Sequence, residues 1–249
     1  MISLRAILYS LCILFGIAFI IISVIAIILY LRTTYYINYL KECDTKTPFC
    51  YIKKIKLSLP ATLIYPLTAL SYNEGARVEI SKKKQKNIDM NTIKKHTPEV
   101  IEWYKSITGQ ISEIIGTSVK IAPLDQPNGV SLVVYEKEGD YIDWHFDTNH
   151  YNGRFFTLLV PVTTEKTCGN YQYKDENEET QVIELNLGEA ILFEGDKVFH
   201  SGKKLCNNQR RIILSLTFVT SDYISPIETV FSKIKYLGMY TPISLSKYF

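Results

Sequence analysis

Two histidines and one aspartate in this sequence have the types and spacing of a mononuclear metal site. His145 and Asp147 form a close pair, and His200 lies far downstream. Two imidazoles and one carboxylate occupy one face of a non-haem Fe(II) ion and leave its other positions open for substrate chemistry. Residues i and i+2 of a strand project from the same face, so His145 and Asp147 can reach one ion from one strand. His200 must then come from a second strand folded alongside.

Short runs of β-branched and aromatic residues surround these ligands and predict the strands that position them. Turn sequences such as Glu138-Gly139-Asp140 and Gly195-Asp196 separate the runs. The predicted strands cover residues 131–135, 154–162, 169–173, 180–185, 190–193 and 211–219, with an acidic hairpin loop at 174–180. Many short strands of this kind indicate an antiparallel sandwich or an open barrel.

A helix is predicted ahead of these strands. Thr97 offers a capping hydroxyl, Pro98 suits the first turn, and Glu99 places an acid at the positive end of the helix. Apolar residues then recur at helical spacing as far as Gly116, the predicted stop. Residues 72–96 are expected to form a loop that helps to set the substrate, as are loops 148–153 and 174–180.

Several residues near the predicted site are expected to serve the fold rather than the chemistry. Asp143 and His150 flank the ligands and are expected to be neighbours of the site. Strand alternation places Trp144 and Phe146 on the opposite face of the sheet from the ligands, as core residues. His96 lies outside the strand region and is expected at the surface.

In order and spacing, these residues resemble the prolyl 4-hydroxylase type of Fe(II)/2-oxoglutarate dioxygenase. The resemblance covers residues 132–219 and rests on Tyr135, Gly139, Asp140, His145, Asp147, Arg154, Thr157, Cys168-Gly169-Asn170-Tyr171, Gly188-Glu189-Ala190-Ile191-Leu192-Phe193, His200-Ser201-Gly202 and Arg211. It implies an oxidoreductase with an α+β, mainly β fold. The implied core is a double-stranded β-helix (jelly roll) with flanking N-terminal helices.

The resemblance implies Fe(II) as the metal and 2-oxoglutarate as the co-substrate, together with ascorbate. It assigns His145, Asp147 and His200 to the metal, and a basic residue to the distal carboxylate of 2-oxoglutarate. Tyr135 and Thr157 are expected to line the co-substrate pocket. For Tyr135, an ordinary sheet aromatic is an equal alternative.

Two adjacent arginines compete for the carboxylate-binding role. Arg211 opens the last predicted strand, and its planar guanidinium suits bidentate capture of a carboxylate. Alternation groups Arg211 with Ile213 and Ser215, whereas the companions of Arg210 are all apolar. The small polar Ser215 fits a ligand pocket, so Arg211 is favoured and Arg210 is the alternative.

An uncharged run at residues 6–31 lies between Arg5 and Arg32. As a helix it is long enough to cross a bilayer, which predicts one retained transmembrane anchor; a cleaved signal peptide is the alternative. The predicted organisation is an anchor at 1–32, a juxtamembrane connector at 33–60, a dioxygenase domain at 61–220 and a C-terminal tail at 221–249.

The cysteines bear on the side of the membrane that the domain occupies. Cys43 with Cys50, and Cys168 with Cys206, are candidate disulfides that suit an oxidising lumen; reduced thiols are the alternative. Basic residues just after the apolar run favour a cytoplasmic domain instead. The family resemblance favours the lumen of the endoplasmic reticulum.

The resemblance implies hydroxylation of a protein or peptide side chain, with proline favoured. A non-protein substrate, or a catalytically silent binding module of the same fold, is the alternative. The net charge of +3 does not indicate nucleic-acid binding. Residues 212–217, after Arg211, also lack the second arginine that nucleic-acid demethylases of this superfamily usually carry.

Overall fold

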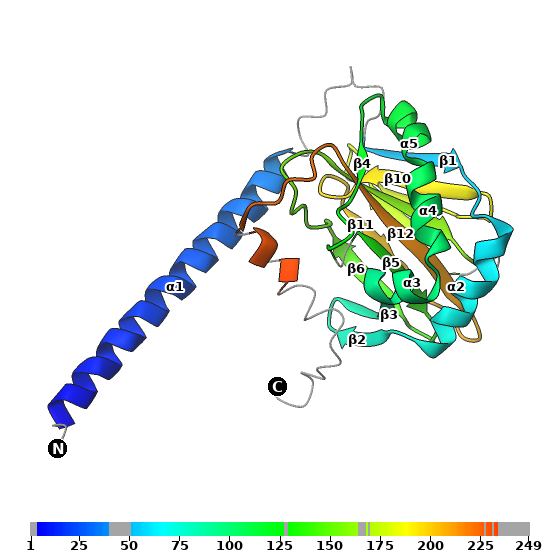
Figure 1. Ribbon diagram of the computed structural model, residues 1–249. Helices are drawn as coiled ribbons and strands as arrows, with labels where there is room; N and C mark the ends of the chain where they lie inside the picture. Colours follow the sequence, from blue (N-terminus) through cyan, green and yellow to red (C-terminus); the bar gives the residue numbers. More distant parts are fainter. Residues whose placement is uncertain are drawn as a thin grey trace. The chain divides into compact units, whose positions relative to one another are not determined.

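The computed structural model describes residues 4–39, 51–126, 129–163, 168, 170–226, 228–230 and 232–233, in two units, Met1–Cys43 and Asp44–Phe249 (Figure 1). The described residues of the first unit form one helix, α1 (Leu4–Tyr39). Its segment Ile7–Ile25 has a mean hydropathy of 2.7, and none of its residues is buried. Its length and composition fit the predicted membrane span and equally a signal sequence. The Cys43–Cys50 pair lies outside the described residues.

The second unit is built on an antiparallel sheet that forms a jelly roll, as predicted. Its strands are β1 (Ile52–Lys56), β2 (Ala76–Ile80), β3 (Lys83–Ile88), β4 (Lys120–Ile121), β5 (Val130–Tyr135), β6 (Tyr141–His145), β7 (Phe155–Pro161), β8 (Tyr171–Lys174), β9 (Thr180–Ile183), β10 (Glu189–Glu194), β11 (His200–Gly202) and β12 (Arg211–Val219). Their order is β1-β10-β7-β12-β5-β3-β6-β11-β8-β9, with β2 beside β3 and β4 beside β12. Each predicted strand is present within a few residues of its expected bounds.

Helices cover one face of this sheet (Figure 1). They are α2 (Ala61–Asn73), α3 (Met90–His96), α4 (Glu99–Ser106) and α5 (Thr108–Ile115). The single helix predicted from Thr97 to Gly116 is thus divided at Ile107, where Thr108 and Gly109, both weak helix formers, follow. Gly116 ends α5 in the left-handed conformation at φ 76°, which supports the predicted stop.

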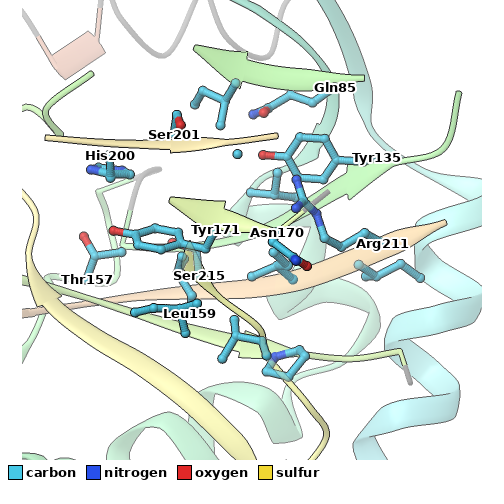
Figure 2. A pocket seen from close by; sticks show the side chains of 18 of the residues that line it. Gln85, Tyr135, Thr157, Leu159, Asn170, Tyr171, His200, Ser201, Arg211 and Ser215 are labelled. Carbon is cyan, nitrogen blue, oxygen red and sulfur yellow. The ribbon is translucent and has the colours of Figure 1, made fainter. Parts of the chain in front are cut away.

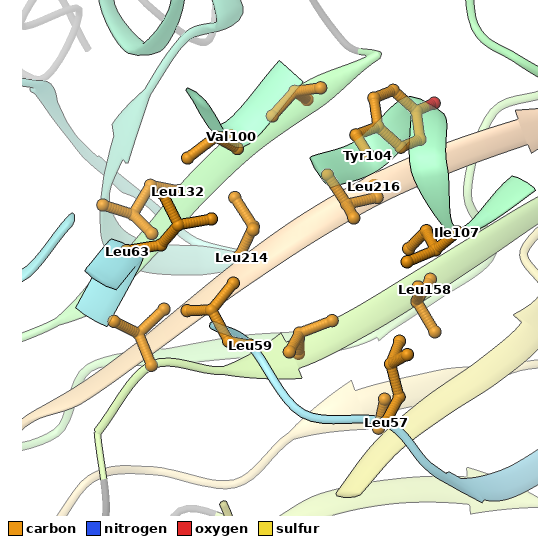
Figure 3. Close-up of a cluster of buried hydrophobic side chains, with 14 of the residues drawn as sticks. Leu57, Leu59, Leu63, Val100, Tyr104, Ile107, Leu132, Leu158, Leu214 and Leu216 are labelled. Atoms are coloured by element: carbon orange, nitrogen blue, oxygen red, sulfur yellow. The ribbon is translucent and has the colours of Figure 1, made fainter. Parts of the chain in front are cut away.

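The alternation of side chains along the central strands separates the core from the site. One face of β5, β7 and β12 contributes Leu132, Leu158, Leu214 and Leu216 to a buried cluster that includes Tyr104 of α4 (Figure 3). The opposite face of the same strands lines a pocket. Burying one such leucine contributes about 2 kcal/mol, so the helix-covered face stabilises the strands that carry the pocket.

Two segments differ from their expected roles. Part of the expected connector 33–60 is strand β1, which pairs with β10 from Ile52 opposite Phe193 to Lys56 opposite Glu189. The segment 72–96, expected to be a loop, contains the hairpin β2–β3 and helix α3. Only part of β3 is buried, and its exposed and half-buried positions are lysines. Its sequence therefore lacks the apolar pattern by which a strand is recognised.

Candidate active site

The structure brings His145, Asp147 and His200 together at one end of the jelly roll. His145 ends β6 and His200 begins β11, and the two residues are direct cross-strand partners. The Nε2 atoms of His145 and His200 lie 3.6 Å and 3.8 Å from Oδ1 of Asp147. One ligand atom from each residue lies within 4.8 Å of the others, a spacing that a single metal ion can bridge.

The path by which Asp147 reaches this cluster differs from the expected one. Strand β6 ends at His145, so Asp147 lies beyond the strand rather than two positions along it. Its backbone N–H donates to the carbonyl of Gly195 over 2.8 Å. Its Oδ2 accepts a hydrogen bond from Oγ1 of Thr157 over 2.8 Å, which leaves Oδ1 directed at the histidines. Contacts with β7 and with the turn after β10 therefore hold the carboxylate.

Hydrogen bonds also fix the two imidazole rings. Nδ1 of His145 lies 2.7 Å from the carbonyl of Asp143, and Nδ1 of His200 lies 2.8 Å from the carbonyl of Val198. Because a carbonyl only accepts, each Nδ1 carries the proton and each Nε2 offers a lone pair to the centre. Asp143 thus acts through its backbone, and its carboxylate lies outside the cluster.

The environment of His200 keeps its ring neutral. Burial and, second, the adjacent His145 together lower the pKa of His200 to about 4, against the opposing effects of Asp147 and of the hydrogen bond to Val198. A neutral imidazole is the form that binds a metal ion. Two histidines and one carboxylate form a donor set that fits Fe(II).

Gly195 leaves the space that the carboxylate needs. A Cβ atom at Gly195 would lie 2.6 Å from Oδ2 of Asp147, 2.8 Å from Oγ1 of Thr157 and 2.5 Å from Cε1 of Phe155. These separations are shorter than van der Waals contact, so only glycine fits beside the Thr157–Asp147 hydrogen bond.

A pocket extends from the three metal-ligand candidates to Arg211 (Figure 2). Figure 2 shows His200, Tyr171 and Thr157 toward one end and Arg211 with Tyr135 toward the other. The pocket is lined by Gln85, Val133, Tyr135, Ile142, His145, Asp147, Thr157, Leu159, Pro161, Thr163, Asn170, Tyr171, Ile183, Glu184, Leu185, Asn186, Phe193, His200, Ser201, Gly202, Arg211, Ile212, Ile213 and Ser215. The predicted residues Tyr135, Thr157 and Arg211 therefore all face the same space as the triad.

Arg211 lies at the pocket end remote from the triad, without an acidic partner. Its guanidinium lies over the ring of Tyr135, 3.9 Å from the ring centre, and the two residues pair across β12 and β5. Burial lowers the pKa of Arg211, and Tyr135 opposes that effect. Among the residues that the structure describes, Arg211 forms no ion pair, and its buried Nε has no hydrogen-bond partner. This cation is available to a ligand carboxylate.

Arg210 points to the other side of the strand. Its Nη2 donates to the carbonyl and hydroxyl of Ser71 at 2.9 and 3.0 Å, and its guanidinium lies over the ring of Tyr72. It does not line the pocket, in contrast to Arg211 and Ser215. Arg211 and Ser215 therefore share the pocket face of the strand, as the alternation of side chains predicted.

Tyr171 and Gln85 line the pocket without having been singled out from the sequence. The ring of Tyr171 stacks on that of His200 at 5.5 Å, and its buried hydroxyl has no partner among the described residues. Burial raises the pKa of Tyr171 well above its usual value, so the phenol stays protonated and can donate. Oε1 of Gln85 is likewise buried without a partner. Tyr171 stood in the motif that carried the resemblance, whereas Gln85 lay in the supposed loop.

The neighbouring residues take structural roles, with one correction. His150 pairs with Glu228, at 2.8 Å, and stays outside the metal-ligand cluster, as expected. His96 is exposed, also as expected. The expectation that Trp144 and Phe146 are core residues is wrong: both are half-buried and stack on Phe199. Strand alternation gives the face of a side chain but not what covers it, and on this face the aromatic side chains pack on one another and stay partly exposed.

The candidate disulfide that lies within the described residues is formed. Cys168 and Cys206 are bonded, and the bridge joins the segment before β8 to the segment before β12. The backbone N–H of Cys168 donates to the side-chain oxygen of Gln209 over 2.9 Å. Both segments lead into pocket residues, Asn170 and Arg211, so the bridge stabilises the pocket wall around Arg211.

Comparison with known proteins gives structural matches only: no protein-family model and no curated protein sequence matches the chain. A prolyl-4-hydroxylase from Pseudomonas putida matches with a TM-score of 0.51 and 14% identity, over 68% of this chain and 91% of that one. A prolyl hydroxylase from Trichoplax adhaerens, in complex with a hypoxia-inducible-factor peptide, matches with a TM-score of 0.50 and 12% identity, over 82% and 95%.

A third solved structure, the epimerase SnoN with Fe3+, alpha ketoglutarate and nogalamycin RO, matches with a TM-score of 0.55 and 11% identity, over 68% of this chain and 78% of that one. This chain has the Fe(II)/2-oxoglutarate oxygenase fold. Within this oxygenase fold it also has the His-Asp-His set suited to the metal. The structures with this fold include enzymes for peptides and enzymes for small molecules, so the fold by itself leaves the substrate class open.

Proposed function

We propose that the chain is a membrane-anchored Fe(II)/2-oxoglutarate-dependent dioxygenase that hydroxylates a protein side chain, in the manner of prolyl 4-hydroxylases. One observation carries the proposal: a single pocket has the His145–Asp147–His200 cluster at one end and, at the other, Arg211, which forms no ion pair with any residue that the structure describes. 2-Oxoglutarate has the matching groups, a 2-oxo acid that chelates a metal and a second carboxylate at the far end of its chain.

Each residue has a defined task in this proposal. His145, Asp147 and His200 hold Fe(II), and Thr157 keeps the Asp147 carboxylate in place. Arg211 binds the distal carboxylate. When bound, iron and 2-oxoglutarate together supply the oxidation by O2 that yields succinate, carbon dioxide and a hydroxylated C–H bond. A dependence on ascorbate stays a prediction.

Tyr135 and Tyr171 shape the two ends of the co-substrate site. The Tyr135 ring holds the Arg211 guanidinium against its face, an arrangement that favours a cation by cation–π attraction. The Tyr171 hydroxyl, buried and protonated beside His200, offers a hydrogen bond to an oxygen of a ligand at the metal end. Both interactions orient the co-substrate and keep water from its polar groups.

A membrane-bound domain in an oxidising compartment, such as the lumen of the endoplasmic reticulum, is part of the proposal. The apolar helix α1 supports anchoring, and the Cys168–Cys206 bridge supports an environment that preserves disulfides. Protease protection of microsomes tests this. Fragments of residues 51–249 that survive protease until detergent is added agree with a lumenal domain, and fragments lost without detergent contradict it.

The substrate class rests on the structural likeness to two prolyl hydroxylases, one of them solved with a peptide. The likeness to SnoN, solved with nogalamycin RO, favours a non-protein substrate as the second candidate. The test is succinate release by the full chain in detergent, screened against peptides with and without proline. Release with proline peptides, together with a gain of one oxygen atom on proline by mass spectrometry, supports the proposal. Stimulation by small molecules alone supports the second candidate, and an absence of succinate with every addition contradicts both.

A further inference from the structure

Gln85 lies in line with the two residues assigned to the distal carboxylate. Tyr135 of β5 pairs directly with Arg211 of β12. On its other edge, β5 pairs with β3 as far as Lys86 opposite Val134, which makes Gln85 the next residue of β3 toward Tyr135. Residues opposite one another on neighbouring strands share a face of the sheet. Figure 2 shows the Gln85 amide directed into the pocket beside Tyr135.

The hydrogen bonding of Gln85 is incomplete on the pocket side. The side chain is only 3% exposed, and its Nε2 donates to Oδ1 of Asn87 over 2.8 Å. Oε1 of Gln85 and Nδ2 of Asn87 are both buried and have no partner among the described residues. A buried amide with half of its capacity unused destabilises a fold, whereas an apolar residue of the same size would not. A buried amide at position 85 therefore points to a ligand that forms the missing hydrogen bond with Gln85.

We infer that Gln85 is a third residue that binds the distal carboxylate of 2-oxoglutarate, alongside Arg211 and Tyr135; this inference rests on the proposed function. A half-turn of both amides exchanges oxygen for nitrogen, so that Nδ2 of Asn87 donates to Oε1 of Gln85. The bond between them is kept, and Nε2 of Gln85 then faces the pocket as a donor. A carboxylate held by Arg211 accepts this N–H.

The arrangement of Gln85, Tyr135 and Arg211 on neighbouring strands also accounts for the selection of a dicarboxylate. A planar arginine fork binds one edge of a carboxylate and leaves lone pairs on the oxygens free. Gly202 lets the guanidinium approach closely, because a Cβ there would lie 3.0 Å from Nη2 of Arg211. Gln85 reaches this end of the pocket from β3, on the opposite side of Tyr135 from Arg211. A 2-oxo acid without the second carboxylate would satisfy neither residue.

The test compares two ligands and three variants of the full chain in detergent. Binding of 2-oxoglutarate and of 2-oxopentanoate, which has the same chain length without the distal carboxylate, is measured by anaerobic calorimetry with Mn(II) at the metal site. Gln85→Leu removes the donor, Gln85→Glu keeps the size and adds a negative charge, and Gln172→Leu makes the same change on β8, away from the pocket lining. Thermal unfolding of each variant checks that it is folded.

We expect Gln85→Leu to weaken 2-oxoglutarate binding about tenfold and Gln85→Glu to weaken it more, because one hydrogen bond to a charged group is lost and then replaced by repulsion. Binding of 2-oxopentanoate should stay unchanged, as should both affinities in Gln172→Leu. Equal affinity of wild type and the Gln85 variants for 2-oxoglutarate overturns the inference, as does equal weakening of both ligands. A wild-type chain that does not bind 2-oxoglutarate overturns the proposed function, and the inference with it.

Discussion

The hydroxyl of Thr157 donates a 2.8 Å hydrogen bond to Oδ2 of Asp147, the carboxylate oxygen turned away from the two histidines. Replacing Thr157 by valine keeps the shape of the side chain and removes this bond. Loss of such a support around a metal ligand typically lowers metal affinity about 10- to 100-fold. We therefore expect Thr157→Val to require a correspondingly higher Fe(II) concentration for half-maximal succinate formation.

Thr68→Val is the matched control, because among the described residues the Thr68 hydroxyl bonds to the carbonyl of Ile64 within α2 and not to the site. It should leave the Fe(II) dependence unchanged. Equal Fe(II) dependence in wild type and Thr157→Val would show that the Thr157 bond does not support the metal site.

Gly195→Ala should reduce metal binding more than Thr157→Val does. The new Cβ would lie 2.6 Å from Oδ2 of Asp147 and 2.5 Å from a ring carbon of Phe155, so the carboxylate must move. Gly109→Ala is the control: it adds a Cβ with nothing within 4 Å at an exposed position of α5, where alanine gains about 0.5–1 kcal/mol. Metal binding by Gly195→Ala at wild-type affinity, measured by calorimetry, would contradict the close packing around Asp147.

Asp196 predicts a specific pH dependence of stability. Burial raises the pKa of Asp196 from 3.8 to about 6, with Glu194 adding to this, against a hydrogen bond from Asn149. A carboxyl whose pKa is higher in the folded state binds more protons when folded. The free energy of unfolding therefore falls as pH rises from about 4 to about 6, by about 3 kcal/mol at most.

Asp196→Asn removes this titration and should be more stable than wild type at pH 7.5. Near pH 4.5, where folded Asp196 is protonated, the difference should shrink. Thermal unfolding at the two pH values measures it. A difference between variant and wild type that is the same at both values would rule out titration of Asp196 as its cause.

The Cys168–Cys206 bridge should contribute strongly to stability. It closes a loop with a sequence separation of 38, for which the chain-entropy account gives about 4 kcal/mol. We expect Cys206→Ser to lower the unfolding midpoint in denaturant when measured without reductant, whereas Cys12→Ser, at the free cysteine of α1, should not. Unfolding midpoints that are equal for Cys206→Ser and wild type would indicate that the bridge does not form in the isolated protein.

Strand patterns in the sequence are sufficient to predict the short antiparallel strands, the placing of His145 and His200 on neighbouring strands and the orientation of Arg211, whereas the jelly roll was implied by the family resemblance. Side chains alternate between the two faces of a strand, so Arg211, Ile213 and Ser215 must share a face once the strand is recognised. His145 and His200 were expected on neighbouring strands because one metal ion needs both, and the two are cross-strand partners. These predictions rest on strand alternation and on the ligands that one ion needs.

Features that depend on contacts between distant segments could not be predicted in this way. Asp147 reaches the cluster through Gly195, which follows another strand, and strand alternation does not describe that path. Gln85 lies in a lysine-rich strand that has β2 along one edge and β5 followed by β6 along the other, and its burial depends on these pairings. Trp144 was expected in the core because alternation gives the face of a side chain, whereas only the packed structure shows whether another layer covers that face.

The most direct test of the account is an anaerobic titration of the full chain in detergent with Fe(II) and 2-oxoglutarate, followed by visible absorption. Wild type should develop a weak charge-transfer band that saturates with both ligands. His200→Ala should show no band, because one of the three metal ligands is lost, and Arg211→Gln should need far more 2-oxoglutarate to reach it. A wild-type chain without the band, or a band of equal strength in His200→Ala, would contradict the assignment of this pocket as an iron and 2-oxoglutarate site.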